Sequence, residues 1–316
     1  MGAEVAANEG AAKAIYDRAD SVVGRSISHL CFEGPEEELR QTINAQPALF
    51  TTSAALLTAL RNRVEVKPFA VAGHSVGEYA AIWAAGGIVF EAGLKVVLRR
   101  AELMQEAAAV HAGTMCAVLG LDIETIRQVC SEVFHRTGGV VSIANYNCPG
   151  QVVISGEVPA VGQAGQMLKE RGAKRIVPLA VSGGFHSPLM VGAGDKLYPH
   201  LRETGFKDTQ IPVVVNVTVE YIRHGVDFPP HLTMQVSGCV RWEESMRLLI
   251  NDGVTTFLEV GAGEVLCSLL RRIEKTKATA EPITALAVND MNSLDEACRF
   301  LDSNEWESLS SGSELI

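Results

Sequence analysis

The sequence predicts an α/β fold in which strands of a parallel sheet alternate with helices and a smaller unit is inserted. Three observations indicate this class. An apolar run at residues 69–72 leads through a turn framed by Gly73 and Gly77 into a helix-forming run at 79–85. Residues 114–180 follow the order strand, helix, strand, strand, helix, strand. After this block, helical and strand-like segments alternate again, as in a parallel sheet with crossover helices.

Hydrophobic periodicity predicts the individual elements. Helical spacing dominates residues 10–64, where Gln46-Pro47 is expected to open an apolar helix that ends near Arg63. The apolar stripe of residues 90–109 predicts a long helix. The central block is expected to contain strands at 115–119, 140–144, 152–155 and 174–179, and helices at 122–134 and 159–171. Later helices are expected at 188–204, 242–251 and 264–273, and later strands at 213–217 and 256–260.

The order of elements in the central block is that of a ferredoxin-like module (βαββαβ). We therefore expect a small subdomain at residues 113–182, inserted into a large subdomain formed by residues 1–112 and 183–303. Residues 304–316 are rich in serine and are expected to form a mobile tail.

The composition bounds the class of protein. With 316 residues, 47% of them hydrophobic and 20% charged, the chain has enough apolar residues for a sizeable core. The net charge of −10 argues against nucleic acid and anionic membranes as partners. Seven scattered cysteines without a C-x-x-C pair are typical of reduced thiols and predict neither a disulfide framework nor a metal site. The acidic start and the absence of a long apolar run predict a cytoplasmic protein.

The turn around Ser75 has the strand, Gly-x-Ser-x-Gly, helix context of a nucleophile elbow. Gly73 and Gly77 would remove β-carbons that clash in so sharp a turn, so that the Ser75 hydroxyl is exposed. The helix that follows would direct its free N–H groups toward a tetrahedral oxyanion. The alternative is a tight turn in which the glycines serve packing alone.

A serine nucleophile needs a base, and His186 is the best candidate among the eight histidines. It follows a glycine pair, and Ser187 and Pro188 after it fit the N-cap and first position of a helix. The alternative is a loop histidine without a catalytic role. His74 is next to the serine but points away along the strand, so we expect it to be structural.

Four segments occur together in family order and spacing: 73–79, 147–156, 184–190 and 259–263. The chain thereby resembles the malonyl-CoA:acyl carrier protein transacylase family and the acyltransferase domains of polyketide synthases over about residues 1–290. The resemblance implies an α/β-hydrolase-like large subdomain with a parallel sheet and a ferredoxin-like insert, in agreement with the pattern of residues 114–180.

The resemblance also implies roles for particular residues. Ser75 matches the family nucleophile and His186 its base. Arg100 matches the arginine that binds the free carboxylate of the substrate, for which a planar guanidinium is well suited. Gln235 matches the glutamine whose backbone carbonyl orients the histidine, and the Val76 N–H is expected to donate to the oxyanion.

The resemblance also bears on substrate specificity, and the residues taken alone allow other roles. Phe185, directly before the histidine, is associated with malonyl over methylmalonyl, although it could simply be packed in the core. Without the resemblance, Arg100 could be a solvated helix arginine like its neighbour Arg99, and Gln235 a surface helix glutamine.

The expected function is transfer of malonyl from malonyl-CoA to the phosphopantetheine thiol of an acyl carrier protein. The reaction proceeds by a ping-pong mechanism through malonyl-serine, in fatty acid or polyketide synthesis. The enzyme would need no cofactor or metal beyond the CoA thioester and the carrier's phosphopantetheine, and it would act as a monomer. One alternative is a serine esterase or thioesterase, which needs an acidic triad member between Ser75 and His186, where none is obvious. The other is an inactive, truncated acyltransferase-like binding domain.

Two further expectations concern the chain's start and its partner. Family members begin with a strand and a Phe-Pro-Gly-Gln-Gly-Ser-Gln loop, which supplies a second oxyanion donor, and this sequence lacks both. Either the start is truncated, which we expect and which predicts weak or no transferase activity, or another element fills the gap. An acidic carrier would need a local positive face, for which four residues of the insert are candidates: Lys169, Arg171, Lys174 and Arg175. The alternative for these four is an ordinary solvated helix end.

Overall fold

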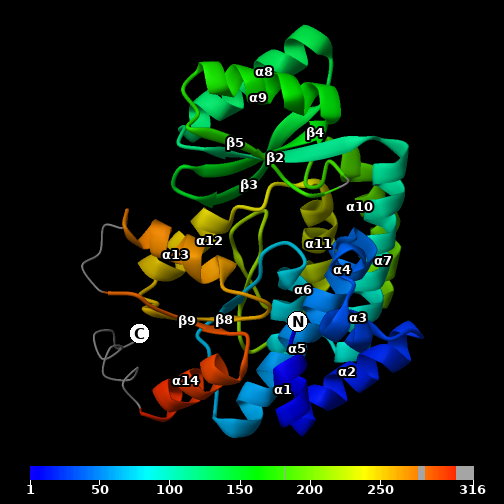
Figure 1. Cartoon of the computed structure of the whole chain (residues 1–316), viewed down its shortest axis with the longest axis vertical. Coiled ribbons are helices and arrows are strands. Elements are labelled where there is room, and N and C mark those ends of the chain that lie inside the picture. The colour runs from blue at the N-terminus through cyan, green and yellow to red at the C-terminus, as the bar shows by residue number, and fades with distance from the viewer. Residues whose placement is uncertain (182, 277–281, 304–316) are drawn as a thin grey trace.

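The computed structural model describes residues 1–181, 183–276 and 282–303 (Figure 1). Helices and strands mix throughout, so the expected α/β class is confirmed. In Figure 1 a small sheet with two helices lies above a larger body of helices and short strands. The expected tail at 304–316 lies outside the described residues. No helix of the described segments is long and apolar enough to cross a bilayer.

The small upper unit has the element order expected from the sequence. Its four strands form a sheet in the order β3-β4-β2-β5, with each neighbouring pair antiparallel. A separate apolar core lies between this sheet and helices α8 and α9. The elements are β2 (Gly113–Leu119), α8 (Ile123–Thr137), β3 (Val141–Cys148), β4 (Gln151–Glu157), α9 (Val158–Glu170) and β5 (Arg175–Pro178).

The N-terminal part is helical, as expected, but one helix begins earlier than predicted. Pro47 lies inside α5 (Thr42–Arg63) rather than at its start. The first turn is held by the N–H groups of Asn44 and Ala45, which both donate to the Gln41 carbonyl. The missing proline N–H therefore falls after a turn that has already formed. The helices before α5 are α1 (Ala3–Asn8), α2 (Gly10–Val23), α3 (Ile27–Glu33) and α4 (Glu36–Arg40).

The expected parallel sheet is present as two separate parallel pairs of strands, not as one continuous sheet. In the first, β1 (Val71–Ala72) pairs with β6 (Val213–Val214), and β7 (Tyr221–Ile222) adds antiparallel to β6. In the second, β8 (Thr256–Val260) pairs with β9 (Thr284–Val288). The strand expected at 213–217 ends early because the Asn216 N–H donates to the Glu78 carboxylate instead of to a neighbouring strand.

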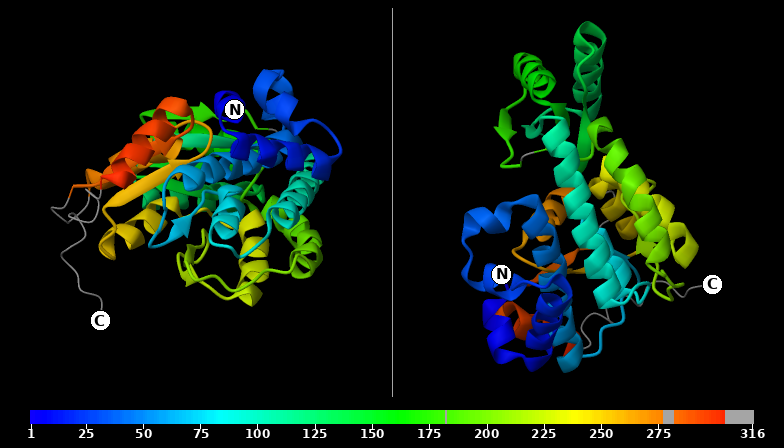
Figure 2. Two further views of the ribbon diagram at one scale, coloured as in Figure 1. Left: turned by 90° about the horizontal axis from the view of Figure 1, so that it is seen from below. Right: turned by 90° about the vertical axis from the view of Figure 1, so that its right-hand side faces the viewer.

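One long helix joins the two parts. Figure 2 shows α7 (Phe90–Val110) running from the larger body up to the small sheet, where it leads directly into β2. It packs against α5 on one side and α10 on the other. The helix expected at 188–204 is a short 3₁₀ turn, η1 (Pro188–Met190), followed by α10 (Val191–Glu203). The remaining helical elements are α6 (Gly77–Ala84), η2 (Gly225–Asp227), α11 (Phe228–Ser237), α12 (Trp242–Asn251), α13 (Val265–Glu274) and α14 (Met291–Asp302).

Candidate active site

Ser75 lies in the sharp turn between β1 and α6 and has a left-handed backbone, with φ of 54°. A β-carbon at Gly73 would lie 2.0 Å from the carbonyl carbon and oxygen of Gly77, so only glycine fits at position 73. The same reasoning is wrong for Gly77, because a β-carbon there would have no atom within 4 Å among the described residues. The turn therefore requires one of its two glycines and leaves open space beside the other.

The fold places the His186 side chain within hydrogen-bond distance of Ser75. The His186 Nε2 lies 2.7 Å from the Ser75 Oγ. With its proton on Nδ1, His186 donates to the backbone carbonyls of Gln235 at 2.9 Å and of Gly238 at 3.2 Å. Nε2 is then free to accept the serine proton. Both side chains thus have the geometry of a nucleophile and its base.

The environment of His186 keeps its imidazole neutral. Only 5% of the residue is exposed, and burial together with the nearby Arg100 cation lowers the pKa of His186 to about 3. Its backbone, with φ of 56°, is also left-handed. Two facing non-glycine residues therefore have sparsely populated backbone conformations, which is typical of functional sites.

The loop that carries His186 is fixed by its neighbour. The Ser187 hydroxyl donates to the Gly184 carbonyl at 2.5 Å and accepts from the Leu189 N–H at 3.3 Å. The expected N-cap role of Ser187 is confirmed, with a 3₁₀ turn as the capped element. This closed turn holds the imidazole rigidly at the site.

Arg100 lies inside the site and not on the helix surface. It is 1% exposed, and its Nη2 donates to Ser75 Oγ at 3.1 Å and to Gln235 Oε1 at 3.0 Å. Its guanidinium carbon lies 5.7 Å from the centre of the Tyr79 ring. The Arg100 Nε is buried and has no hydrogen-bond partner within the described segments. By contrast Arg99 is partly exposed and pairs with an acidic side chain of its own helix, so the solvated alternative applies to Arg99 alone.

The other expected site residues lie nearby. Gln235 is fully buried, which excludes the surface alternative. Phe185 is 8% exposed and packs in the main apolar core. Val76 is the N-cap residue of α6, so its N–H lies at the positive end of that helix. His74 is turned away, as expected, with its Nε2 3.0 Å from the Asn147 Oδ1 of the small unit.

Sequence reasoning missed three polar residues of this site. Gln46, on α5, accepts a hydrogen bond from Arg100 through its side-chain oxygen. The Asn216 side chain accepts from the Ser75 N–H at 2.8 Å and donates to the Gly73 carbonyl at 2.7 Å. Glu78 is 1% exposed, at the start of α6. Asn216 interrupts the apolar run at 213–217, and Gln46 and Glu78 directly precede the apolar parts of their helices, which was the only signal that the sequence offered.

A serine hydroxyl bonded to a neutral histidine, with a buried arginine beside both, has the geometry of a serine acyl-transfer centre. The sequence matches the family model described as acyl transferase domain over residues 1–302. The chain belongs to this family, and it is an acyltransferase.

Relatives and solved structures agree with this assignment. The chain is 44% identical, over 90% of both sequences, to malonyl CoA-acyl carrier protein transacylase of Bacillus subtilis (strain 168). It is 38% identical to the Escherichia coli (strain K12) protein of the same name over 94% of both. Among solved structures, a malonyl-transacylase in complex with a type II polyketide synthase acyl-carrier protein has a TM-score of 0.90 at 40% identity, covering 95% of this chain and 94% of that one. The Coxiella burnetii malonyl CoA-acyl carrier protein transacylase has a TM-score of 0.90 at 32% identity, covering 95% and 93%.

Proposed function

We propose that this protein transfers malonyl from malonyl-CoA to the phosphopantetheine thiol of an acyl carrier protein, through a malonyl ester of Ser75. The observation that carries this proposal is the buried Arg100 guanidinium beside the Ser75 and His186 pair. Its Nε–H has no partner among the described residues, so a carboxylate can bind there without competing for that donor. The reaction would supply malonyl units to fatty acid or polyketide synthesis.

In the first half-reaction His186 acts on Ser75. The neutral Nε2 accepts the Oγ proton while Oγ attacks the thioester carbonyl carbon. The oxyanion that forms accepts a hydrogen bond from the Val76 N–H at the start of α6. When the C–S bond breaks, the imidazolium returns its proton to the departing CoA thiolate, and malonyl remains on Ser75.

The second half-reaction reverses these steps with a new thiol. His186 accepts the proton of the phosphopantetheine thiol, and the sulfur attacks the ester carbonyl. The Ser75 oxygen leaves and regains its proton from the imidazolium. Arg100 binds the malonyl carboxylate in both steps and so keeps the acyl group in one orientation.

Gln235 would orient the base, and Phe185 would limit the size of the acyl group. The Gln235 backbone carbonyl fixes the Nδ1–H tautomer of His186, as an aspartate does in a hydrolase triad. The Phe185 ring, next to the base, would occupy the space that an α-methyl group needs. Such steric selection is typically about 1–3 kcal/mol, so it gives a preference for malonyl over methylmalonyl.

The subdomain boundaries expected from the sequence fit this mechanism. We assign residues 113–182 to a ferredoxin-like subdomain, and residues 1–112 and 183–303 to an α/β-hydrolase-like subdomain that carries the nucleophile, the base and the arginine. The antiparallel sheet order and the separate core support the first assignment. The parallel pairing of β1 with β6 beside the elbow supports the second.

Incubation with malonyl-CoA tests the function directly. We expect intact-protein mass spectrometry to show one malonyl adduct on the wild-type chain, formed slowly because the second oxyanion donor expected from the family is missing. Ser75→Ala should show none, because that variant has no oxygen in reach of the base. Addition of a carrier protein bearing phosphopantetheine should discharge the adduct onto the carrier. An adduct that persists in Ser75→Ala, or one that water releases faster than the carrier accepts it, would contradict the proposal.

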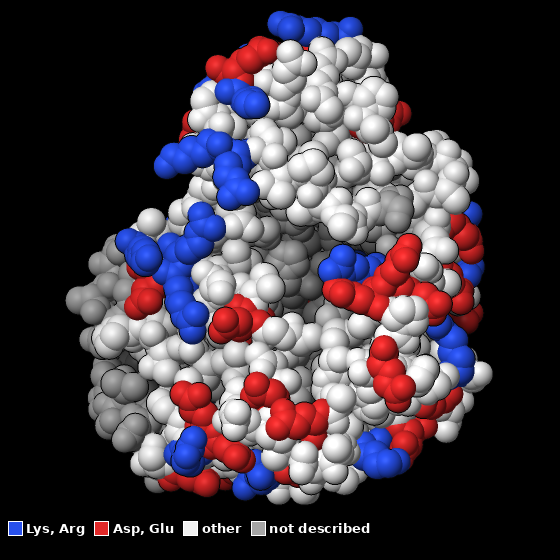
Figure 3. All heavy atoms as spheres, viewed as in Figure 1, with Lys and Arg blue, Asp and Glu red and all other residues white. Residues whose placement is uncertain are grey.

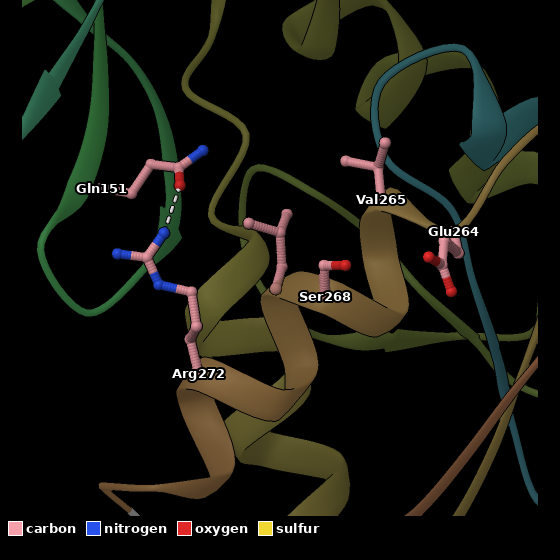
Figure 4. A pocket seen from close by; sticks show the side chains of 6 residues that line it. Gln151, Glu264, Val265, Ser268 and Arg272 are labelled. Atoms are coloured by element: carbon pink, nitrogen blue, oxygen red, sulfur yellow. Dashed lines mark hydrogen bonds between the residues drawn. The ribbon is translucent and has the colours of Figure 1, made fainter.

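The carrier would dock on a positive surface beside the hollow between the two parts. Figure 3 shows Lys and Arg side chains gathered there, over α13 and the adjacent edge of the small sheet. Figure 4 shows a cavity at this place, where Arg272 of α13 donates to the Gln151 side chain at 2.7 Å. The Lys174 stem packs on Gly120 in the same region. Of the residues expected from the sequence, Arg171 is engaged by Glu132 and is the weakest candidate.

Charge reversal tests this surface. In Lys174→Glu combined with Arg272→Glu we expect KM for the carrier to rise about tenfold, because two attractive charges become repulsive. Self-acylation by a malonyl thioester should not change, since neither residue contacts the nucleophile. Lys13→Glu, exposed on α2, is the matched control and should leave both constants unchanged. An unaltered carrier KM in the double variant would remove this surface from consideration.

A further inference from the structure

We propose that Glu78 is a positioning residue for acyl transfer, whose buried carboxylate ties the nucleophile turn to the segment that orients His186 and balances positive charge at the site. This inference rests on the proposed function. Glu78 is not the acidic triad member that an esterase would need, and none was obvious in the sequence between Ser75 and His186. The carboxylate is present but acts through Gln235, because the Nδ1 of His186 faces backbone carbonyls instead.

The contacts of Glu78 join two distant segments. Its Oε2 accepts the Asn216 N–H at 2.9 Å and the Gln235 Nε2–H at 3.0 Å. Asn216 in turn binds the Ser75 N–H and the Gly73 carbonyl through its side chain. The left-handed turn at Ser75 is therefore held by a residue that Glu78 fixes.

Gln235 connects the same carboxylate to the base and the arginine. Its Nε2 donates to Glu78 and also to the Ser75 carbonyl at 2.9 Å. Its Oε1 accepts from Arg100, and its backbone carbonyl accepts from His186. One glutamine thus lies between Glu78 and each of the three groups that would perform the reaction.

Arg100, on α7, is the charged group that acts on Glu78, and the neutral Tyr79 is its neighbour on α6. His186, on the loop before η1, is connected to Glu78 through Gln235. No acidic oxygen lies within 4.0 Å of Arg100 in the part of the chain that the structure describes. Through Gln235, an ionised Glu78 would stabilise an imidazolium when His186 takes a proton.

The ionisation of Glu78 falls in an accessible pH range. Burial raises the pKa of Glu78 to about 7, although the bonds from Gln235 and Asn216 and the Arg100 charge oppose this shift. Both hydrogen bonds use Oε2, whereas Oε1 has no partner within the described residues. Protonation at Oε1 would therefore leave the network in place and remove only the charge. Below pH 7 the network would persist without the charge, and above pH 7 the charge would be present.

The test compares the wild-type chain with Glu78→Gln, whose amide oxygen can accept the same two hydrogen bonds. The substrate is the malonyl thioester of N-acetylcysteamine, which has no phosphate that titrates near neutrality. We expect the rate of Ser75 acylation in the wild type to rise about tenfold as pH increases through 7, as a buried charge near the base predicts. In Glu78→Gln this rise should vanish, with rates like the wild type's at pH 6 and about tenfold lower at pH 8.

Controls separate this role from folding and from the proposed function. Glu91→Gln removes a carboxylate from the exposed start of α7 and should keep the wild-type profile. A wild-type profile that is flat between pH 6 and 8, or the same rise in Glu78→Gln, would overturn the inference. A flat profile would overturn the inference even if Glu78→Gln does not fold, because that profile is measured on the wild type alone. A wild-type chain that forms no malonyl-serine would instead contradict the proposed function and the inference with it.

Discussion

Replacement of His186 by alanine is expected to slow acylation of Ser75 by about 10⁴-fold or more, the usual effect of removing the base of such a pair. The imidazole is the basic group at 2.7 Å from the serine oxygen, and its low pKa keeps it neutral above about pH 4. The Nδ1 contacts to two backbone carbonyls fix the orientation of the ring. The remaining groups of the site should still bind the substrate.

The measurement is single-turnover release of thiol from a malonyl thioester, with the adduct followed by mass spectrometry. The matched control is His135→Ala, an exposed histidine at the end of α8, which should acylate at the wild-type rate. Binding of malonyl thioester to His186→Ala should change less than threefold, since Arg100 remains. A rate within tenfold of the wild type would show that another group takes the serine proton.

Replacement of Arg100 by alanine is expected to reduce acylation by malonyl donors on the order of 10²–10³-fold, because a buried charge pair with the carboxylate is lost. Acylation by acetyl donors should not fall and is expected to rise. An acetyl group has no carboxylate to neutralise Arg100, and the Arg100 cation is one of the causes that lower the pKa of His186. Without the arginine the imidazole becomes a stronger base, so the acylation rate with acetyl donors rises. With malonyl donors the loss of the charge pair outweighs this gain.

The ratio of malonyl to acetyl acylation rates is the quantity to measure. Arg99→Ala is the matched control, since Arg99 is the adjacent arginine on the same helix and pairs with Glu102 at the surface. Its ratio should equal that of the wild type. Equal losses with both donors in Arg100→Ala would indicate a purely structural role, and thermal unfolding of the variant would then be expected to show a large loss of stability.

Much of the fold follows from local sequence patterns. The helix at 242–251 begins and ends as predicted, and that at 90–109 within one residue, because their apolar stripes and flanking residues determine them. The strand at 213–217 was predicted too long because its apolar pattern does not show that Asn216 turns toward Glu78. Pro47 was placed at a helix start because a local rule cannot show that the preceding turn is already closed.

The sequence by itself predicted the pair of Ser75 and His186, because the conformation of each depends on residues next to it. Gly73 permits the turn that exposes Ser75, and Ser187 closes the loop that holds His186. Only the tertiary structure decided that Arg100 is the buried arginine, and only it revealed the contacts of Gln46, Asn216 and Glu78. Those contacts join segments more than a hundred residues apart in several cases, and their strength comes from burial, which depends on packing and not on neighbours in the chain.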